Sequence, residues 1–507
     1  MYAPLYEALL KHVSTNPTPY HVPGHQHGRA FRVNQEIEEY TRPLYPMAML
    51  DLTEIRATDD LHHPEASIHE AASLAAACYG AEESFFLVGG STAGNVAMIL
   101  TACSQPDDII LVQRNVHKSV LNGLKLAGAS AVFLAPQIDE SSGVATVPTL
   151  NHVRQALEAY PQARAVLLSN PNYYGMGTEL TEYASLIHSY ECILLVDEAH
   201  GAHYGLHPEL PPSALQAGAD AVVQSTHKTL TALTMGAMLH VQGSRIQRQQ
   251  LRHILSMVQS SSPSFPIMAS LDIARAMVDH YGEALFEPCL ASASSIRGWI
   301  RQSQSVIGLL EDMDREGIPA YEHSDPLRLV IYDRTGTHSG VALQRKLEES
   351  GIWTEMADDR YVVLVIGIGS TAEDRNKLIA ALETVSLDVL KDKETVGDGQ
   401  SFVWNTSSSP QMLMPPEEQV AAPVPFHRFF ISADEVEIVP LNEAVGRRSA
   451  EMIIPYPPGI PVLYEGEVIM ESTVQLLQKL SDAGAKLQGA SDPSVLRIKV
   501  MQPPQSP

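Results

Sequence analysis

The sequence predicts an α/β fold with a mostly parallel sheet, because short apolar runs alternate with longer amphipathic ones between Leu50 and about Gly236. The apolar runs are the expected strands, and the stretches between them are long enough for the crossover helices that parallel strands require. The expected strands are residues 84–88, 109–113, 131–135, 165–169, 193–196 and 221–224, and the expected helices include 93–103, 150–159 and 180–190.

A chain of 507 residues exceeds the roughly 250–300 at which a single core stops growing, so several domains are expected. A helix at 266–281 precedes a second α/β segment that ends near Lys391, with strands at 327–331 and 361–366. A stretch rich in Ser, Pro, Gln and Gly follows it. We predict an N-terminal arm at 1–50, a major domain at 51–290, a smaller α/β domain at 291–395, a linker at 396–425 and a C-terminal α+β domain at 426–507.

The net charge of −25 argues against nucleic acid as a partner, because phosphate binding needs a concentrated positive surface. No run reaches the ~18 apolar residues of a membrane span, and the first residues lack the basic and apolar segments of a targeting signal. We therefore expect a cytoplasmic protein with a small-molecule partner. The four cysteines, Cys78, Cys103, Cys192 and Cys289, form no C-x-x-C pair, so we expect buried thiols and no metal site.

Lys228 is the most informative position, because it directly follows the expected strand 221–224 within Ser-Thr-His-Lys. Ligands of α/β proteins bind at the carboxyl ends of strands. A lysine there can form a Schiff base if its amine is held unprotonated. A lysine in a loop is more often a solvated surface charge, so Lys228 needs support from other positions.

Asp197 follows the expected strand 193–196, in Asp-Glu-Ala-His-Gly. A carboxylate at the mouth of a buried parallel strand faces the ligand, and it can keep a heterocyclic nitrogen of a cofactor protonated. The competing interpretation is an aspartate that caps the next helix or loop.

The segment Gly-Gly-Ser-Thr-Ala-Gly-Asn at residues 89–95 lies between an expected strand and an apolar helix. Glycines let a backbone approach an anion, Ser91 and Thr92 can donate to it, and the helix N-terminus adds N–H groups. The segment predicts a phosphate cradle, although its spacing matches neither the P-loop nor the dinucleotide fingerprint. An ordinary strand-to-helix turn is the alternative.

His117 follows the expected strand 109–113 and could stack on a cofactor ring at the neighbouring strand end. A single histidine is more often a packed or surface residue.

Taken together, these elements resemble the fold-type I pyridoxal-phosphate enzymes, and within them the bacterial ornithine/lysine/arginine decarboxylase family in its short Gram-positive branch. Further matching motifs are Tyr-His-Val-Pro-Gly-His at 20–25, Asp-Asp-Leu-His at 59–62, Ser-Thr-His-Lys at 225–228, Ser-Ser-Ser-Pro at 260–263 and the proline-rich stretch 455–461. One departure is Gln26, where relatives carry lysine.

The resemblance implies an aspartate aminotransferase-like major domain, pyridoxal 5'-phosphate as cofactor, and at least a homodimer with Ser261 or Ser262 near the neighbouring site. It implies that Lys228 bonds the cofactor, that Asp197 pairs with the pyridine nitrogen and that His117 stacks on the ring. The other implied cofactor contacts are Ser91, Thr92, Ala93, Ala199, Ser225 and His227.

The implied reaction is α-decarboxylation of lysine, arginine or ornithine to a polyamine-related amine and CO2, with Lys228 or His200 returning a proton to Cα. The acidic cluster of Glu54, Asp59 and Asp60 could accept the distal cation of the substrate, or it could be a solvated loop or cap. Two alternatives stay open. One is another reaction of the same fold, such as transamination or aldol cleavage, and the other is a catalytically silent regulatory protein.

Overall fold

The computed structural model describes residues 1–303, 305–313, 319–396, 420–426, 432–455, 460–482 and 485–502. Most of the predicted linker at 396–425 and residues 456–459 of the proline-rich stretch lie outside them. The chain forms two compact units that combine distant segments. Unit 1 is Met1–Ala102 with Ile193–Phe286, and unit 2 is Cys103–Cys192 with Glu287–Pro507. The predicted domain boundaries stay predictions.

Unit 1 contains four neighbouring strands in the order β1-β8-β7-β6. They are β1 (Glu83–Leu87), β8 (Ala237–Val241), β7 (Ala221–Gln224) and β6 (Ile193–Asp197). Strands β6 and β7 are parallel, whereas β8 is antiparallel to both β7 and β1. The strands predicted from apolar runs are confirmed to within one residue, and β8 is an additional strand that runs opposite to the others.

Helix α5 (Gly90–Ala102) follows β1 and packs on all four strands. Because β8 is antiparallel to both β1 and β7, β1 runs in the same direction as β7 and β6, and the N-terminus of α5 lies at the edge where β6 and β7 end. The helix begins three residues before the predicted start at residue 93. Later in unit 1 the chain forms the α-helices α9 (Thr226–Thr229), α10 (Arg248–Val258) and α11 (Phe265–Tyr281).

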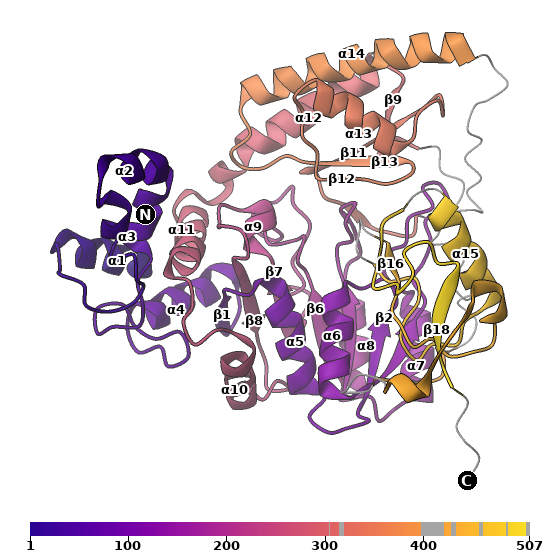
Figure 1. Cartoon of the computed structure of the whole chain (residues 1–507), viewed down its shortest axis with the longest axis horizontal. Helices are drawn as coiled ribbons and strands as arrows, with labels where there is room; N and C mark the ends of the chain where they lie inside the picture. Colours follow the sequence, from indigo (N-terminus) through magenta and orange to yellow (C-terminus); the bar gives the residue numbers. More distant parts are fainter. Residues whose placement is uncertain are drawn as a thin grey trace. The chain divides into compact units, whose positions relative to one another are not determined.

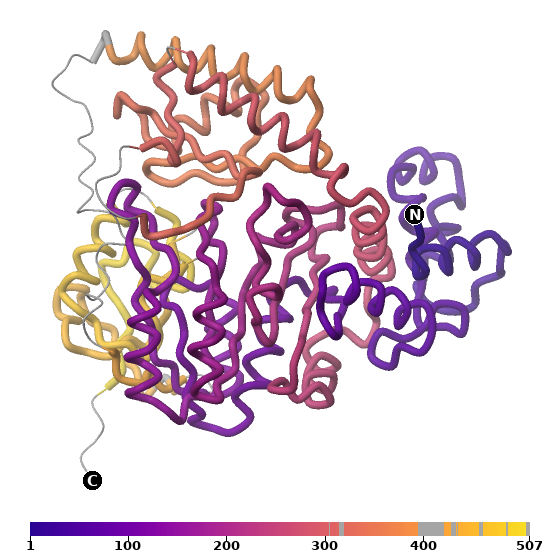
Figure 2. Tube along the Cα trace, turned by 180° about the vertical axis from the view of Figure 1, so that it is seen from behind, coloured from indigo at the N-terminus to yellow at the C-terminus, as the bar shows by residue number. Residues whose placement is uncertain are grey.

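The N-terminal arm consists of short helices, drawn in indigo in Figure 2, with α1 packed on α4 and α11. The helices of the arm are α1 (Pro4–Ser14), α2 (Gln35–Thr41) and α3 (Tyr45–Leu50), and α4 (Ser67–Tyr79) follows the arm. Leu5 and Leu9 of α1 are fully buried, and the Leu5 N–H donates to Asp272 Oδ2 of α11 at 2.9 Å. Arg275, also on α11, donates to both Asp272 and the Tyr2 carbonyl. These contacts fix the start of the chain on α11.

Unit 2 contains the strand order β4-β2-β3-β14, in which β2 is parallel to β3 and β4, and β14 is antiparallel to β3. The strands are β2 (Ile109–Gln113), β3 (Ser130–Leu134), β4 (Ala165–Ser169) and β14 (Val424–Pro425). Its helices here are α6 (Lys118–Ala127), α7 (Leu150–Ala159) and α8 (Thr181–Ser189). The apolar strands are almost wholly buried, as in parallel sheets covered on both faces.

The smaller sheet of unit 2 has the order β12-β13-β11-β9 and is antiparallel throughout. Helices α12 and α13 pack on it and α14 packs on those helices, as Figure 1 shows. The bounds are α12 (Glu287–Gln302), β9 (Ile307–Leu309), β11 (Arg328–Asp333), α13 (Gly340–Glu349), β12 (Met356–Ala357), β13 (Tyr361–Val365) and α14 (Ala372–Val396). A two-stranded pair joins β5 (Met176–Gly177) to β10 (His323–Ser324).

The C-terminal segment has its own apolar core, which includes Leu463, Leu477 and Ile498. Its elements are β15 (Val436–Pro440), β16 (Ile454–Pro455), α15 (Glu471–Asp482), β17 (Leu487–Gln488) and β18 (Arg497–Met501). Tyr464 stacks on Phe133 of β3, and Glu467 pairs with Arg114 just after β2. The C-terminal domain therefore covers the strand ends that precede His117. None of the described helices combines the length and apolar character needed to span a bilayer.

Candidate active site

Asp197 is the last residue of β6, and only 4% of it is exposed. Its Oδ2 accepts a hydrogen bond from Asn95 Nδ2 at 2.8 Å, and its Oδ1 accepts one from the Ala199 N–H at 3.1 Å. The bond to Ala199 is the local turn that the capping interpretation expects. The bond to Asn95 comes from a different element and fixes the plane of the carboxylate. Because both donors are neutral amides, the negative charge of Asp197 is not offset by either of them.

Asn95 reaches Asp197 because Gly94 lets α5 lie against the strands. A Cβ at Gly94 would lie 2.4 Å from Val223 Cγ2 of β7 and 2.9 Å from Leu87 Cδ1, so no other residue fits there. Asn95 is fully buried and had no predicted role. The position of Asn95 at the end of the glycine-rich segment could have drawn attention to it. Its partner could not have been predicted, because no sequence pattern predicts what a buried amide on a helix will contact.

Lys228 lies in the short helix α9, directly after β7, and its Nζ is 3.0 Å from Nε2 of His200. Asp197 is paired with Val223 in the parallel register of β6 and β7, so Lys228 and His200 both follow the carboxyl ends of adjacent strands. The structure therefore brings together Lys228 and His200, as expected for partners in proton transfer. Which atom donates depends on the protonation of the two groups.

The predicted phosphate contacts also lie in unit 1. Ser91, Thr92 and Ala93 form the first turn of α5, where N–H groups and the helix dipole favour an anion. The Ser225 hydroxyl is fully buried and has no hydrogen-bond partner among the described residues. A buried hydroxyl without a partner costs about 1–3 kcal/mol, so Ser225 fits a site completed by a bound anionic group.

His227 has a more restricted role. Its Nδ1 lies 3.1 Å from the Gly236 carbonyl, and because a carbonyl only accepts, Nδ1 carries the proton. The Nε2 atom can then donate to a phosphate only when the ring is doubly protonated. Ser225 can therefore donate to a phosphate directly, whereas Nε2 of His227 can do so only when the ring is doubly protonated.

His117 lies in unit 2, where it is the N-cap of α6 and its Nδ1 accepts from the Ser119 N–H at 3.2 Å. This bond orients the imidazole and leaves the proton of the neutral ring on Nε2. Stacking of His117 on a cofactor ring stays a prediction.

The three acidic residues proposed for substrate binding differ. Asp59 accepts four backbone N–H bonds, from Asp60, Glu65, Ala66 and Ile68, all at 2.9–3.0 Å. Burial alone would raise the pKa of Asp59, but these bonds together hold it below the usual value. The carboxylate has no acceptor site left, which favours the capping interpretation for Asp59.

Asp60 accepts from the His62 N–H at 2.8 Å. Glu54 accepts from the Thr53 hydroxyl with Oε2, whereas its Oε1 is buried and has no hydrogen-bond partner within the described ranges. Of the three residues, Glu54 therefore offers the most available acceptor for a cation.

Glu198 is a fully buried carboxyl beside Asp197 to which the sequence gave no role. It accepts from Gln224 Nε2 and from the Ala214 N–H, both at 2.7 Å. Burial raises the pKa of Glu198 to about 8 despite these bonds. The site thus combines two neighbouring carboxyls in different environments.

Comparisons with known proteins give a consistent result. The family model "Orn/Lys/Arg decarboxylase, major domain" matches residues 3–316, and the corresponding C-terminal domain model matches residues 407–492. Uncharacterized protein YaaO of Bacillus subtilis is 42% identical over 495 residues, covering 96% of both chains. An arginine decarboxylase of Bacillus anthracis is 34% identical over 503 residues, covering 98% of this chain and 97% of that protein.

Among solved structures, the constitutive lysine decarboxylase of Escherichia coli is similar with a TM-score of 0.79 and 20% identity. The similarity covers 99% of this chain and 82% of that one. It confirms the predicted fold class, in which a large mostly parallel sheet is followed by a smaller domain and a C-terminal domain. The resemblance inferred from the motifs is confirmed by the family models.

Proposed function

Because the chain belongs to the Orn/Lys/Arg decarboxylase family, we propose that it is a pyridoxal-phosphate-dependent carboxy-lyase that decarboxylates a basic amino acid. The observation that carries the proposal is the pairing of Lys228 with His200 at 3.0 Å, beside a strand that ends in the buried carboxylate of Asp197. A nucleophilic amine, an acid–base group and a fixed negative charge are the groups that this chemistry needs at one strand edge.

When bound, pyridoxal phosphate supplies an electron sink for the carbon–carbon bond that breaks. We propose that Lys228 holds the cofactor covalently and that Asp197 keeps its pyridine nitrogen protonated. Ser91, Thr92 and Ser225 would bind the phosphate, with Ala93, Ala199 and His227 as further contacts. His117 would pack on the ring. The buried Ser225 hydroxyl and the first turn of α5 support the phosphate assignment.

The side chains of this chain have two tasks in the reaction. The first is to hold the α-carboxylate of the substrate out of the ring plane, since orientation selects the bond that breaks. The second is to return a proton to Cα after CO2 leaves. Lys228 Nζ and His200 Nε2 lie within hydrogen-bond distance of each other, so a proton can pass between them before it is delivered.

We propose arginine as the substrate to test first. The relative named arginine decarboxylase is 34% identical, whereas the similar structure named lysine decarboxylase is 20% identical. Glu54 supports a cationic substrate, because its buried Oε1 atom can accept from a guanidinium or an ammonium group. We do not extend this role to Asp59, whose acceptor sites are used by the backbone.

The test is a product screen of the purified protein, reconstituted with pyridoxal phosphate, against carboxyl-labelled arginine, lysine and ornithine. We expect labelled CO2 and the matching amine, with arginine preferred. Keto-acid formation without CO2 would instead identify an aminotransferase. A protein that gains no visible absorbance from the cofactor and releases no CO2 would be a silent member of the fold.

The proposal also includes a homodimer in the cytoplasm. The support is the family resemblance and the exposure of Ser261 and Ser262, which would approach a neighbouring site. Mixing a Lys228→Ala chain with a Ser261→Ala, Ser262→Ala chain tests it by complementation. If the site is shared, the mixed dimers contain one site with both defects and one with neither, and activity returns on mixing.

A further inference from the structure

Three histidines of the N-terminal arm gather into one cluster. They are His12 in the last turn of α1, His21 in the following loop, and His27 in the turn before the short helix Arg29–Arg32. One ring nitrogen from each lies within 4.8 Å of the others. The His12 and His21 rings lie 5.6 Å and 5.4 Å from the His27 ring, centroid to centroid, so His27 is the central member.

The cluster leaves imidazole nitrogens without ordinary partners. Nε2 of His12 and Nε2 of His27 are buried and make no hydrogen bond to any described residue. His27 as a whole is only 8% exposed. A buried ring nitrogen that neither donates nor accepts is costly unless a ligand completes it.

His21 is oriented by its neighbour. Its Nδ1 lies 2.6 Å from the Val22 carbonyl, so Nδ1 carries the proton and the lone pair is on Nε2. A ring N–H that donates to a backbone carbonyl is the usual second contact of a histidine that binds metal. His21 is half-buried, which gives an ion and a water molecule access to the cluster.

We propose that His12, His21 and His27 form a binding site for a divalent transition-metal ion, with zinc as the first candidate. Three neutral imidazoles with an open fourth position for water are a ligand set that zinc accepts. Imidazole also suits Cu, Ni and Co, whereas Mg and Ca prefer oxygen ligands. None of these three histidines belongs to the residues that we propose hold the cofactor.

The distances are close to what such an ion requires. With zinc–nitrogen bonds of about 2.0–2.1 Å in a tetrahedron, ligand nitrogens are separated by about 3.3 Å. The observed upper limit of 4.8 Å is larger, and side-chain rotation of His12 and His21 toward the buried His27 would close the difference. The backbone at Gln26, His27 and Gly28 has positive φ angles of 52°, 56° and 78°, a turn that points His27 back toward α1.

Some of the surrounding charges and dipoles favour a bound cation, and others oppose it. His12 lies at the C-terminus of α1, where the helix dipole favours a cation. Burial lowers the pKa of His27, as do His12, His21, Arg29 and His25. Burial and His21 likewise lower the pKa of His12. A lowered pKa favours the neutral imidazole, which is the form that binds a metal ion. The positive charge of Arg29 opposes a bound cation.

Metal binding would join three segments of the arm. The ion would link α1, the loop at 17–22 and the turn at 26–28, so it would stabilise the arm on which Leu5 and Leu9 are buried. The expectation of no metal site came from the cysteines alone and did not consider these histidines.

The test is calorimetric titration of Zn²⁺ and Co²⁺ into the untagged, chelator-treated full-length holoenzyme. We expect one ion per chain and, for Co²⁺, the intense visible bands of tetrahedral coordination. His12→Gln and His21→Gln change partly exposed side chains and should keep the fold, with affinity reduced by at least about tenfold. His27→Gln should bind least.

The matched control is His253→Gln, which changes an exposed histidine of α10 in the same unit. It should bind both ions like the unchanged protein. The visible absorbance of the bound cofactor reports whether each variant has kept its fold. Absence of binding to the unchanged protein would overturn the proposal, as would equal binding by the His12 and His253 variants.

Discussion

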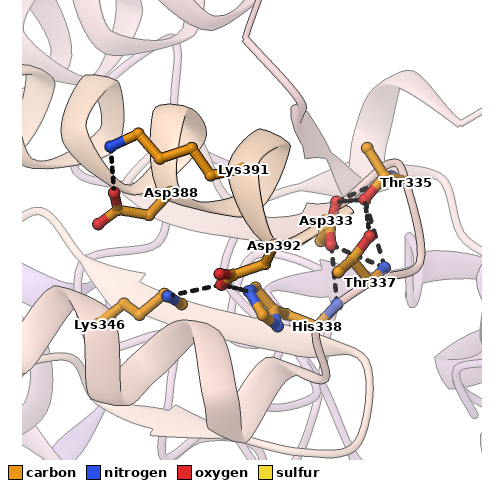
Figure 3. A network of polar contacts seen from close by, with 8 residues as sticks. All are labelled: Asp333, Thr335, Thr337, His338, Lys346, Asp388, Lys391 and Asp392. Atoms are coloured by element: carbon orange, nitrogen blue, oxygen red, sulfur yellow. Dashed lines mark hydrogen bonds and ion pairs between the residues drawn. The ribbon is translucent and has the colours of Figure 1, made fainter. Parts of the chain in front are cut away.

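A lysine, a histidine and an aspartate occur at two places in the molecule, and their contacts differ between the two. At the strand edge of unit 1, Lys228 pairs with His200, and Asp197 bonds to neutral amides. In the smaller domain, shown in Figure 3, Lys346 and His338 both point at Asp392, at 3.1 and 3.0 Å.

The difference lies in what the carboxylate binds. The side chain of Asp392 is 44% exposed, and its charge is offset by Lys346 and His338. The hydrogen bond from Lys346 holds the pKa of Asp392 below its usual value, with a further contribution from His338. Asp197 is buried, and the donors to its two oxygens, Asn95 and Ala199, are neutral amides, so these bonds leave its charge uncompensated. Reactive groups are therefore distinguished by their partners and burial rather than by residue type.

The largest expected effect is that of removing the strand-edge lysine. Lys228→Ala should abolish CO2 release and the visible absorbance of the bound cofactor, because no other amine follows β7 at this position. Lys346→Ala, the matched change in the smaller domain, should keep both. Steady-state CO2 release and absorbance spectra measure the two effects. Retained turnover in Lys228→Ala would show that another group holds the cofactor.

The next effect concerns the carboxylates. Asp197→Asn preserves the size and can still accept from the Ala199 N–H, and a flipped Asn95 amide can accept from its new Nδ2, but it removes the charge that we propose lies opposite the cofactor nitrogen. Loss of one partner of a buried charge pair costs about 3–5 kcal/mol, so kcat should fall by about 10²- to 10⁴-fold. Asp392→Asn should leave kcat unchanged. Equal kcat values for the two variants would remove the proposed electrostatic role of Asp197.

The sequence predicted the parallel strands well because each is a short apolar run. Three of them, 109–113, 165–169 and 221–224, match the structure residue for residue. Strand β8 was missed, since it follows no crossover helix and contains His240, a buried histidine hydrogen-bonded to Ser84. Alternating strand and helix patterns cannot predict an antiparallel strand inserted between parallel ones.

The site residues were predictable where strand ends position them. Lys228, Asp197 and Ser225 follow expected strands, and family motifs supported them. Asn95 could not be predicted, because its contact with Asp197 depends on how closely α5 approaches β7. The cluster of His12, His21 and His27 was missed for the same reason, since these residues meet only through a turn with positive φ angles.

A smaller effect is expected from Glu198, whose pKa is raised whereas the pKa of Asp392 is lowered. Since the folded protein retains the Glu198 proton up to pH about 8 while the unfolded chain loses it near 4.5, stability should fall as pH rises through this range. Glu198→Gln removes the titration, and a flipped Gln224 amide can satisfy the new side chain. Thermal unfolding of the two holoenzymes at pH 5 to 8 should show the variant gaining stability relative to the unchanged protein, by a few kcal/mol at most. A pH-independent difference would place the Glu198 pKa in its ordinary range.

The smallest effect is expected for Asp392, and it runs in the other direction. Because the folded pKa of Asp392 is lowered, its contribution is present above the pKa of the unfolded chain and is lost as pH falls through the folded value. Asp392→Asn should destabilise the protein by about 0–1 kcal/mol at pH 7, the range of exposed ion pairs. The difference should shrink in high salt and vanish in acid, as followed by thermal unfolding. A loss of stability that is larger than that range and insensitive to salt would mean that Asp392 supports the packing of α14 on α13 rather than a screened surface network. Asp392 and the buried carboxylate of Asp197 would then differ in position alone.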